Sequence, residues 1–392
     1  MRILFISRWR PWPPNNGSKL RVLQLLRCLA SDHRVSLLSF HDPAEWAPAL
    51  PPEVLALDEF HEVPYKEFNP RSGRSLLGFL STAPRSILDT YSAGMANAIR
   101  SRVRGDAFDL VVASQMWTAA YRSLFPGIPA IFEEVELGLM QDTAGKTGTF
   151  LRRTRDRLTW AKHRLFLRRL VHRFQFCTVA SAPEQRSLQE VAPEYRHVRV
   201  IPNCIDIAGY RPFQRETNPC MLVFAGSMTY WPNHDAMTWF LREIYPTVKR
   251  RHPALRLVIT GKGLHLDLPR AAGVERTGMV EDVRPIMSSA TVSIAPLRFG
   301  GGTRLKILEA MALKTPVVAT SKAVEGLDVR NGEHLLVADE PADFADALDD
   351  LLSHPARRRQ LAENALGLVT RKYDWKTLKP AVLQLAEDAR RT

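Results

Sequence analysis

The chain has little of what marks secreted, membrane-spanning or metal-bound proteins. It holds four cysteines, far apart and without metal-ligand or redox-pair spacing, which we expect to be reduced in a cytosolic protein: Cys28, Cys177, Cys204 and Cys220. No stretch reaches the roughly 18 to 20 apolar residues of a membrane span. The N-terminal apolar run, Ile3 to Ile6, is too short for a signal peptide and is followed by arginines rather than a cleavage site.

Acidic residues are also in deficit. The 392 residues include 54 Lys and Arg against 41 Asp and Glu, a net charge of +13. The excess lies mainly in residues 1–200, which hold 28 basic and 19 acidic side chains. Such asymmetry indicates a face that meets an anionic partner: a phosphate-bearing substrate, a membrane surface or nucleic acid. No Asp-x-Asp motif stands in a convincing place, and we expect no metal site.

What is present is an alternation of strand-like apolar runs and helical stripes, typical of doubly wound parallel sheets. The alternation stops at a Pro-rich stretch, 202–219, which we interpret as a linker, and then restarts. We therefore predict two α/β domains, 1–205 and 206–375, with a helix at 376–392 packing back on the first. The expected strands are Ile3–Ser7, Val35–Phe40, Leu110–Ala113, Ala130–Phe132, Phe176–Ala180, Val198–Ile201, Met221–Ala225, Leu255–Thr260, Val292–Ala295, Pro316–Ala319 and His334–Val337.

The most informative segment runs from Leu297 to Ala310. Three glycines follow a predicted strand and lead into an apolar-periodic helix, an arrangement that brings backbone N–H groups close to a phosphate. Thr303 can cap this helix. Arg304 and Lys306 place cations in its first turn, where they oppose the helix dipole unless an anion lies between them. A helix start with solvated basic residues is the alternative.

Taken in order, these stretches resemble the retaining GT-B glycosyltransferases of family 4, the exopolysaccharide-type group 1 enzymes. The resemblance spans nearly the whole chain and rests on Ile201-Pro202-Asn203, Phe224 to Met228, Pro232-Asn233, Gly278 to Val280 and Gly300 to Pro316. It implies two Rossmann-like domains facing each other across a cleft, the first for the acceptor and the second for a nucleotide sugar. It also implies no cofactor and no metal requirement.

The resemblance implies a donor-binding set in the second domain. A glutamate at position 309 would accept hydrogen bonds from the ribose hydroxyls. The family's second glutamate is replaced here by Gly301, and its Arg and Lys on the loop after the first strand of this domain are absent. We therefore expect Arg304 and Lys306 to neutralise the diphosphate and to act in catalysis. The donor-binding set is Gly226, Ser227, Gly278, Met279, Val280, Gly300, Gly301, Gly302, Thr303, Arg304, Lys306, Leu308 and Glu309.

In the first domain, Asn15-Asn16-Gly17-Ser18 resembles the family's glycine loop, which makes Gly17 a catalytic candidate; Ser18 could equally be a helix cap. Glu136 matches a family position, although a carboxylate at a helix start explains it too. The family's histidines, after the strand at 110–113 and near position 133, are missing. Asn16, Gln115 and Glu134 are candidates for the contacts that these would make.

Residues 150–174 carry nine Lys and Arg and one Asp. Apolar residues recur every seven positions, in the series Leu151, Leu158, Leu165 and the series Trp160, Leu167, Phe174. We expect an amphipathic helix on an anionic membrane, although a core-packed helix with a solvated basic face fits too. Nucleic acid is disfavoured because no nucleic-acid-binding motif accompanies the charge.

The predicted function is the transfer of a hexose, with retention, from a UDP- or GDP-linked sugar. The acceptor would be a hydroxyl of an oligosaccharide or a lipid-linked saccharide, in polysaccharide or glycoconjugate biosynthesis. We expect a cytoplasmic protein, peripheral on the inner face of the membrane. Two alternatives stay open: a donor-binding partner subunit that has lost catalysis and, less favoured, a UDP-sugar 2-epimerase.

Overall fold

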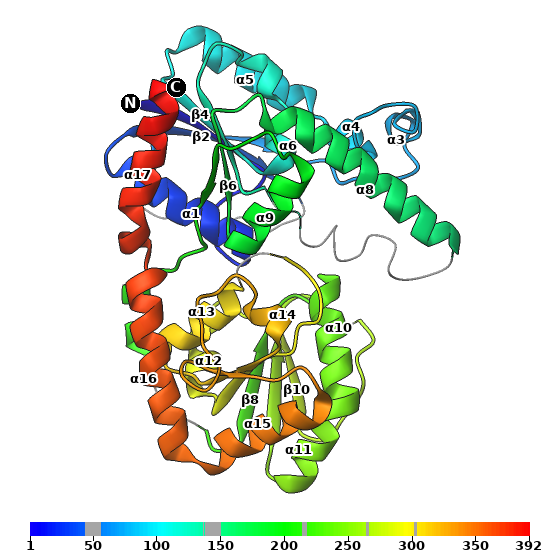
Figure 1. Ribbon diagram of the computed structural model, residues 1–392, viewed down its shortest axis with the longest axis vertical. Helices are drawn as coiled ribbons and strands as arrows, with labels where there is room; N and C mark the ends of the chain where they lie inside the picture. Colours follow the sequence, from blue (N-terminus) through cyan, green and yellow to red (C-terminus); the bar gives the residue numbers. More distant parts are fainter. Residues whose placement is uncertain (44–55, 136, 138–149, 214–217, 264–265, 302–303) are drawn as a thin grey trace. The chain divides into compact units, whose positions relative to one another are not determined.

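The structure is a computed structural model that describes residues 1–43, 56–135, 137, 150–213, 218–263, 266–301 and 304–392 (Figure 1). Contacts divide the chain into two compact units. Unit 1 comprises Met1–Pro202 together with Leu378–Thr392, and unit 2 comprises Asn203–Thr377.

Unit 1 is built on a seven-stranded, all-parallel sheet with strand order β3-β2-β1-β4-β5-β6-β7. The apolar runs that form its central strands are buried, since helices cover such a sheet on both faces. The strands are β1 (Arg2–Ser7), β2 (Arg34–His41), β3 (Glu59–Pro64), β4 (Leu110–Ser114), β5 (Ala130–Glu133), β6 (Phe176–Val179) and β7 (Val198–Val200).

The helices of unit 1 connect these strands, as parallel pairing requires. Several begin at a polar cap; the Asn16 side chain, for example, accepts from the backbone N–H of Lys19 at 2.9 Å. The helices are α1 (Gly17–Ala30), α3 (Gly73–Leu77), α4 (Arg85–Thr90), α5 (Ala93–Gly105), α6 (Gln115–Ala119), η1 (Arg122–Leu124), α8 (Phe150–Val171), α9 (Ala182–Val191) and α17 (Trp375–Arg391), which belongs to unit 1 from Leu378 on.

Unit 2 repeats the design with a six-stranded parallel sheet, in the order β10-β9-β8-β11-β12-β13. Its strands are β8 (Met221–Ala225), β9 (Arg256–Thr260), β10 (Val274–Gly278), β11 (Val292–Ala295), β12 (Val317–Ala319) and β13 (Leu336–Val337). Its helices are η2 (Ile207–Gly209), η3 (Arg211–Phe213), α10 (Trp231–Trp239), η4 (Phe240–Ile244, a π-helix turn), α11 (Tyr245–Arg251), α12 (Arg284–Ser289), α13 (Leu305–Ala312), α14 (Ser321–Val324), α15 (Pro341–Ser353) and α16 (Pro355–Lys372).

The prediction of two α/β domains with doubly wound parallel sheets is confirmed. The interpretation of 202–219 as a mere linker is wrong for its described residues. Ile205 is fully buried in unit 2 and its backbone N–H donates to the carbonyl of Tyr373. Ile207 and Tyr210 are buried as well, so this segment forms part of the body of unit 2.

In both sheets the strand order reverses next to the first strand of the unit. In unit 1 this happens between β1 and β4, and in unit 2 between β8 and β11. The loops that leave two such neighbouring strands diverge, so open parallel sheets bind ligands at the carboxyl ends of the strands there. Each unit therefore has one position at which its architecture favours a binding site.

Candidate functional site

The position between β8 and β11 in unit 2 is occupied by the start of α13. Lys306, the second residue of this helix, donates from Nζ to Oδ1 of Asn233 at 2.8 Å. The Asn233 amide in turn donates from Nδ2 to the carbonyl oxygen of Ser227 at 2.9 Å. The ammonium also lies 4.0 Å from the ring centroid of Phe224. Asn233 belongs to α10, so Lys306 ties α13 to α10 and, through the Asn233 amide, to the loop that follows β8.

The loop after β8 can pass this close because it carries glycine. A Cβ built on Gly226 would lie 2.8 Å from Nζ of Lys306 and 2.8 Å from Nδ2 of Asn233. A Cβ on Gly261 would come within 2.2 Å of the carbonyl oxygen of Gly226, and Gly261 has a φ of +138°. Any side chain at either position would displace the groups around Lys306.

The surroundings of Lys306 are unfavourable to its charge. Burial and the nearby Arg304 cation together lower the pKa of Lys306 from 10.5 to about 7, and the Glu309 carboxylate partly opposes them. Within this part of unit 2, the ammonium is therefore only partly protonated at neutral pH. An anion bound next to it would favour the protonated form.

Arg304 is the residue that precedes α13, and its side chain folds back over the glycine-rich turn. One Nη donates to the carbonyl of Gly301 and the other to that of Phe299 at 3.4 Å. Its Nε is buried and has no hydrogen-bond partner within the described part of the chain. Because Arg304 is the N-cap, the prediction that it lies in the first helical turn is wrong by one residue; its own side chain makes no capping hydrogen bond. Gly302 and Thr303 lie outside the described residues.

Glu309 lies three residues after Lys306, on the same face of α13. It accepts a hydrogen bond at Oε1 from the hydroxyl of Tyr210 at 2.8 Å. Burial raises the pKa of Glu309, while the Tyr210 bond and the charges of Lys306 and Arg284 lower it. Burial, with the adjacent carboxylate, also raises the pKa of Tyr210, so the phenol keeps its proton.

Sequence reasoning missed Tyr210 and Arg284. The guanidinium of Arg284 donates to the carbonyl of Gly209 at 2.8 Å and to Oδ1 of Asp282 at 2.8 Å. It lies 4.3 Å from the ring centroid of Phe213 and so fixes the segment that carries Tyr210. The only signal in the sequence was an aromatic residue inside a stretch that otherwise resembles a linker.

The remaining predicted donor residues lie nearby in unit 2. The carbonyl of Gly278, at the end of β10, accepts from the N–H of Gly261 at 2.9 Å, and Met279 after it is exposed. Ser227 and Gly300 belong to the loops after β8 and β11. Val280 is partly exposed, whereas Leu308, on α13, is fully buried.

Unit 1 has a polar cluster beside its own strand-order reversal. Gln115 follows β4 and Glu134 follows β5; both have left-handed backbone, with φ of 68° and 55°. Nε2 of Gln115 donates to Oε2 of Glu134 at 3.0 Å and to Oγ of Ser18 at 3.3 Å. Nε1 of Trp9, after β1, donates to Oε1 of Gln115 at 3.1 Å. Strained residues held together in this way are common at functional sites.

A buried ion pair supports this cluster from below. Nε of Arg21, on α1, donates to Oε1 of Glu133 at 2.5 Å, and its Nη1 donates to the carbonyl of Ile201 at 2.8 Å. The hydroxyl of Ser114 donates to the other oxygen of Glu133 at 2.8 Å. This ion pair could not be predicted from the sequence, because an arginine beside an apolar stripe normally points into solvent.

The structure changes the interpretation of the glycine loop in unit 1. Asn16 is the cap of α1, so its side-chain oxygen already accepts a backbone hydrogen bond, and Gly17 is the first residue of the helix. The Ser18 hydroxyl contacts Gln115 instead of capping. Glu136 lies outside the described residues.

Within the described residues, no group of three or more His, Cys, Asp or Glu side chains is placed to hold a metal ion. None of the described helices has both the length and the apolar character to cross a bilayer.

Residues 219–354 match the sequence profile of a family described as "Glycosyl transferases group 1", so the chain contains a group 1 glycosyltransferase domain. A phosphatidyl-myo-inositol mannosyltransferase of Mycobacterium leprae is 32% identical over 161 residues, which are 38% of this chain and 41% of that protein. The chain spans about half or less of the length of the curated relatives it matches.

Solved structures agree with the fold over the whole chain. Sucrose-phosphate synthase from Thermosynechococcus elongatus has a TM-score of 0.71 at 16% identity and is covered to 98%, as is this chain. HepE from Anabaena, in complex with UDP and glucose, has a TM-score of 0.66 at 14% identity, again with 98% of each chain covered. At these identities the likeness establishes the GT-B fold.

Proposed function

We propose that this protein is a retaining glycosyltransferase that uses a nucleotide diphosphate sugar and no metal. It would transfer a hexose to a hydroxyl of an oligosaccharide or lipid-linked acceptor in polysaccharide or glycoconjugate biosynthesis. The observation that carries the proposal is the start of α13. There a cation held by Asn233 of α10 and a carboxylate one turn later share one helix face, beside the position where the sheet of unit 2 favours a ligand.

These two groups suit the two ends of a nucleoside diphosphate. Lys306 and the N–H groups at the start of α13 would meet the diphosphate, with Arg304 adding charge beside them. Glu309, which keeps one oxygen on Tyr210, has lone pairs left for the ribose hydroxyls. The complex of HepE with UDP and glucose supports a uridine nucleotide as the first candidate.

The chemistry needs no covalent carboxylate. The acceptor oxygen attacks the anomeric carbon on the face from which the diphosphate leaves. The bond from that carbon to the phosphate oxygen breaks, and the acceptor proton passes to an oxygen of the departing diphosphate. Lys306 and Arg304 would stabilise the charge that develops there, in place of a metal ion. Gly17, Gln115, Glu134 and Glu136 of unit 1 would supply contacts to sugar and acceptor.

The first test is a thermal-shift screen against UDP, GDP, ADP and dTDP, with and without EDTA. A ligand that binds only the folded state raises the melting temperature in proportion to ln(1 + [L]/Kd). We expect one nucleotide to stabilise the protein, EDTA to change nothing, and Glu309→Ala to weaken binding about ten-fold or more, since it removes charge-assisted hydrogen bonds. Glu363→Ala, on exposed α16, is the matched control.

Donor turnover then separates the alternatives. A transferase releases nucleoside diphosphate slowly from the donor even without acceptor, whereas an epimerase changes the sugar and leaves it attached. Nucleotide binding without any turnover would favour the catalytically degenerate partner subunit. No stabilisation by any of the four nucleotides would contradict the assignment of the α13 site.

A further inference from the structure

Helix α8 presents apolar side chains on two opposite faces. One series, Trp160 and Leu167 on the helix and Phe174 just after it, packs in the core of unit 1. The other contains Leu158 and Leu165, which are 63% and 40% exposed. Leu158 and Leu167 are nine residues apart, about half a turn around an α-helix, so the two series point in opposite directions. The core-packed interpretation of this helix is therefore correct for the inner face only.

The outer face of α8 alternates leucine with basic residues. At successive spacings of three and four residues it reads Arg155, Leu158, Lys162, Leu165 and Arg169. Residues at these spacings are neighbours on one helix face. Arg155 and Arg169 are exposed, and Asp156 is the only acidic residue between 150 and 174. This face is cationic and apolar at once.

A second exposed apolar group lies beside it. Leu76, Leu77, Phe79 and Leu80, at the end of α3 and just after it, are 53%, 69%, 56% and 90% exposed. Side chains of this size are seldom gathered in water without a partner. The guanidinium of Arg85 lies 3.9 Å from the ring centroid of Phe79, so this segment also carries positive charge.

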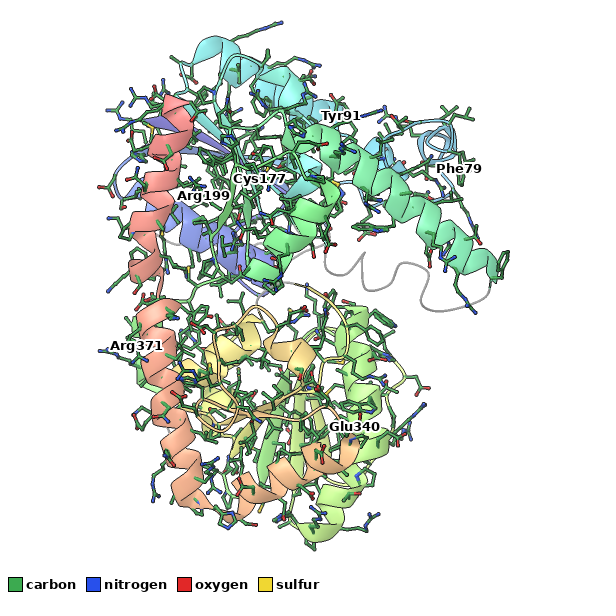
Figure 2. All side chains as sticks on the ribbon, in the orientation of Figure 1. Phe79, Tyr91, Cys177, Arg199, Glu340 and Arg371 are labelled. Atoms are coloured by element: carbon green, nitrogen blue, oxygen red, sulfur yellow. The ribbon has the colours of Figure 1, made fainter. Side chains whose placement is uncertain are left out.

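Lys162 joins the two groups. Its Nζ donates to the carbonyl oxygens of Gly78 at 3.0 Å and Phe79 at 2.9 Å. Because Lys162 belongs to the outer face of α8, the exposed segment lies against that face. Figure 1 shows α3 and α8 together, and Figure 2 shows Phe79 on this loop. The outer face of α8 and residues 76–80 form one surface, which we call the α3–α8 surface.

We propose that the α3–α8 surface binds an anionic lipid bilayer, with the side chains of residues 76–80 inserted among the lipids and the basic residues of α8 on the headgroups. This deepens the proposed function and rests on it for the identity of the acceptor. A bilayer fits because aliphatic side chains enter its acyl boundary while arginine and lysine pair with lipid phosphates. A second copy of this chain, itself basic here, would meet like charge.

Vesicle flotation of the full chain tests the proposal. We expect binding to vesicles of phosphatidylglycerol mixed with phosphatidylcholine, at least about ten-fold stronger than to phosphatidylcholine alone and weakened by salt. Leu77→Asn with Leu80→Asn should lower partitioning about ten-fold or more. Arg155→Gln with Arg169→Gln should reduce it and flatten its salt dependence.

Matched controls keep the result specific. Val200→Asn removes an exposed apolar side chain elsewhere in unit 1, and Arg359→Gln with Arg371→Gln removes two cations from α16; Figure 2 labels Arg371 there. Both controls should bind vesicles like the unmodified protein. Circular dichroism and melting temperature establish that each variant is folded.

Three outcomes would overturn the proposal: variants that bind vesicles as well as the unmodified chain, equal binding to neutral and anionic vesicles, or a dimer by light scattering that Leu77→Asn with Leu80→Asn dissociates. The nucleotide screen is read in parallel, because the proposed donor residues lie in unit 2. If the unmodified protein binds nucleotide but not vesicles, the α3–α8 surface proposal is contradicted and the proposed function is not. If it binds vesicles but none of the nucleotides, the proposed function is contradicted and the α3–α8 surface proposal is not.

Discussion

At the scale of single residues, Lys306 makes donor binding depend on pH. Its pKa is about 7 in the ligand-free protein, and a bound diphosphate would raise it, so binding above pH 7 takes up a proton. Nucleotide affinity should fall by up to about ten-fold per pH unit above 7. The phosphate itself contributes little in that range, since its second pKa is about 6.

Calorimetric titration at pH 6.5, 7.5 and 8.5, in buffers of different ionisation enthalpy, measures this proton uptake. Lys306→Met should abolish this proton uptake, and Lys314→Met, just beyond the C-terminal end of α13, should not. The free energy of unfolding should change with pH in the opposite direction to nucleotide affinity. The unfolded chain keeps the lysine proton up to about pH 10.5, so unfolding free energy should rise between pH 7 and 10.5 in the ligand-free protein. If Lys306→Met takes up as many protons on nucleotide binding as the unmodified protein, Lys306 does not contact the diphosphate.

Tyr210 acts on a nucleotide only through Glu309. Tyr210→Phe removes the hydrogen bond that orients the carboxylate, and it should weaken nucleoside diphosphate binding about ten-fold, or about 1.4 kcal/mol. A 2′,3′-dideoxy analogue should bind both proteins equally, because it lacks the hydroxyls that Glu309 would hold. Isothermal titration gives both affinities.

Tyr245→Phe is the matched control for this variant. It removes another buried hydroxyl of unit 2, which donates to the carbonyl of Ala272. A general loss of packing would weaken the analogue and the natural nucleotide alike, in either variant. That pattern would show that Tyr210 supports the fold rather than Glu309.

At the scale of elements, strands with continuous apolar runs were predictable and polar edge strands were not. All the buried central strands, such as β1 and β8, were expected from their sequence. The strands β3 and β10 lie at sheet edges and contain Glu-Phe-His-Glu and Val-Glu-Arg-Thr, so no apolar run marks them. Edge strands face water on one side and carry polar residues for that reason.

In the candidate site, too, some residues could be predicted from the local sequence and others could not. Local chemistry pointed to Lys306, because a glycine turn and a helix start can be recognised within about ten residues, whereas Glu309 was predicted from the family resemblance. The partners that hold them, Asn233 and Tyr210, are 73 and 99 residues away in sequence. A single sequence does not show which distant side chains meet. The seven-residue recurrence of apolar residues in α8 could likewise be seen in the sequence. The sequence did not show which of the two apolar faces lies in the core.

At the scale of the whole molecule, unit 1 is made of two separated pieces of chain. Val382, Leu385 and Ala386 of α17 line a cavity of about 20 Å³ with Leu25 and Leu29 of α1. Deleting residues 378–392 would expose this apolar surface. Burial of each large side chain stabilises by about 1.5–3 kcal/mol, so unit 1 should lose several kcal/mol.

Differential scanning calorimetry checks this expectation. The truncated chain should show a lowered transition for unit 1, while a second transition stays where it was and still responds to nucleotide. Val382→Ala with Leu385→Ala is the milder version, for use if the truncated chain aggregates. A single transition that shifts as a whole would mean that the units unfold together.

The division of unit 1 also has a consequence for synthesis on the ribosome. Its sheet is complete once β7 has emerged, but the part of α17 that belongs to unit 1 is translated only after unit 2. Unit 1 is thus begun before unit 2 and completed after it. During that interval the apolar side of α1 has no covering helix, so the nascent chain offers a chaperone a binding surface that the mature protein lacks.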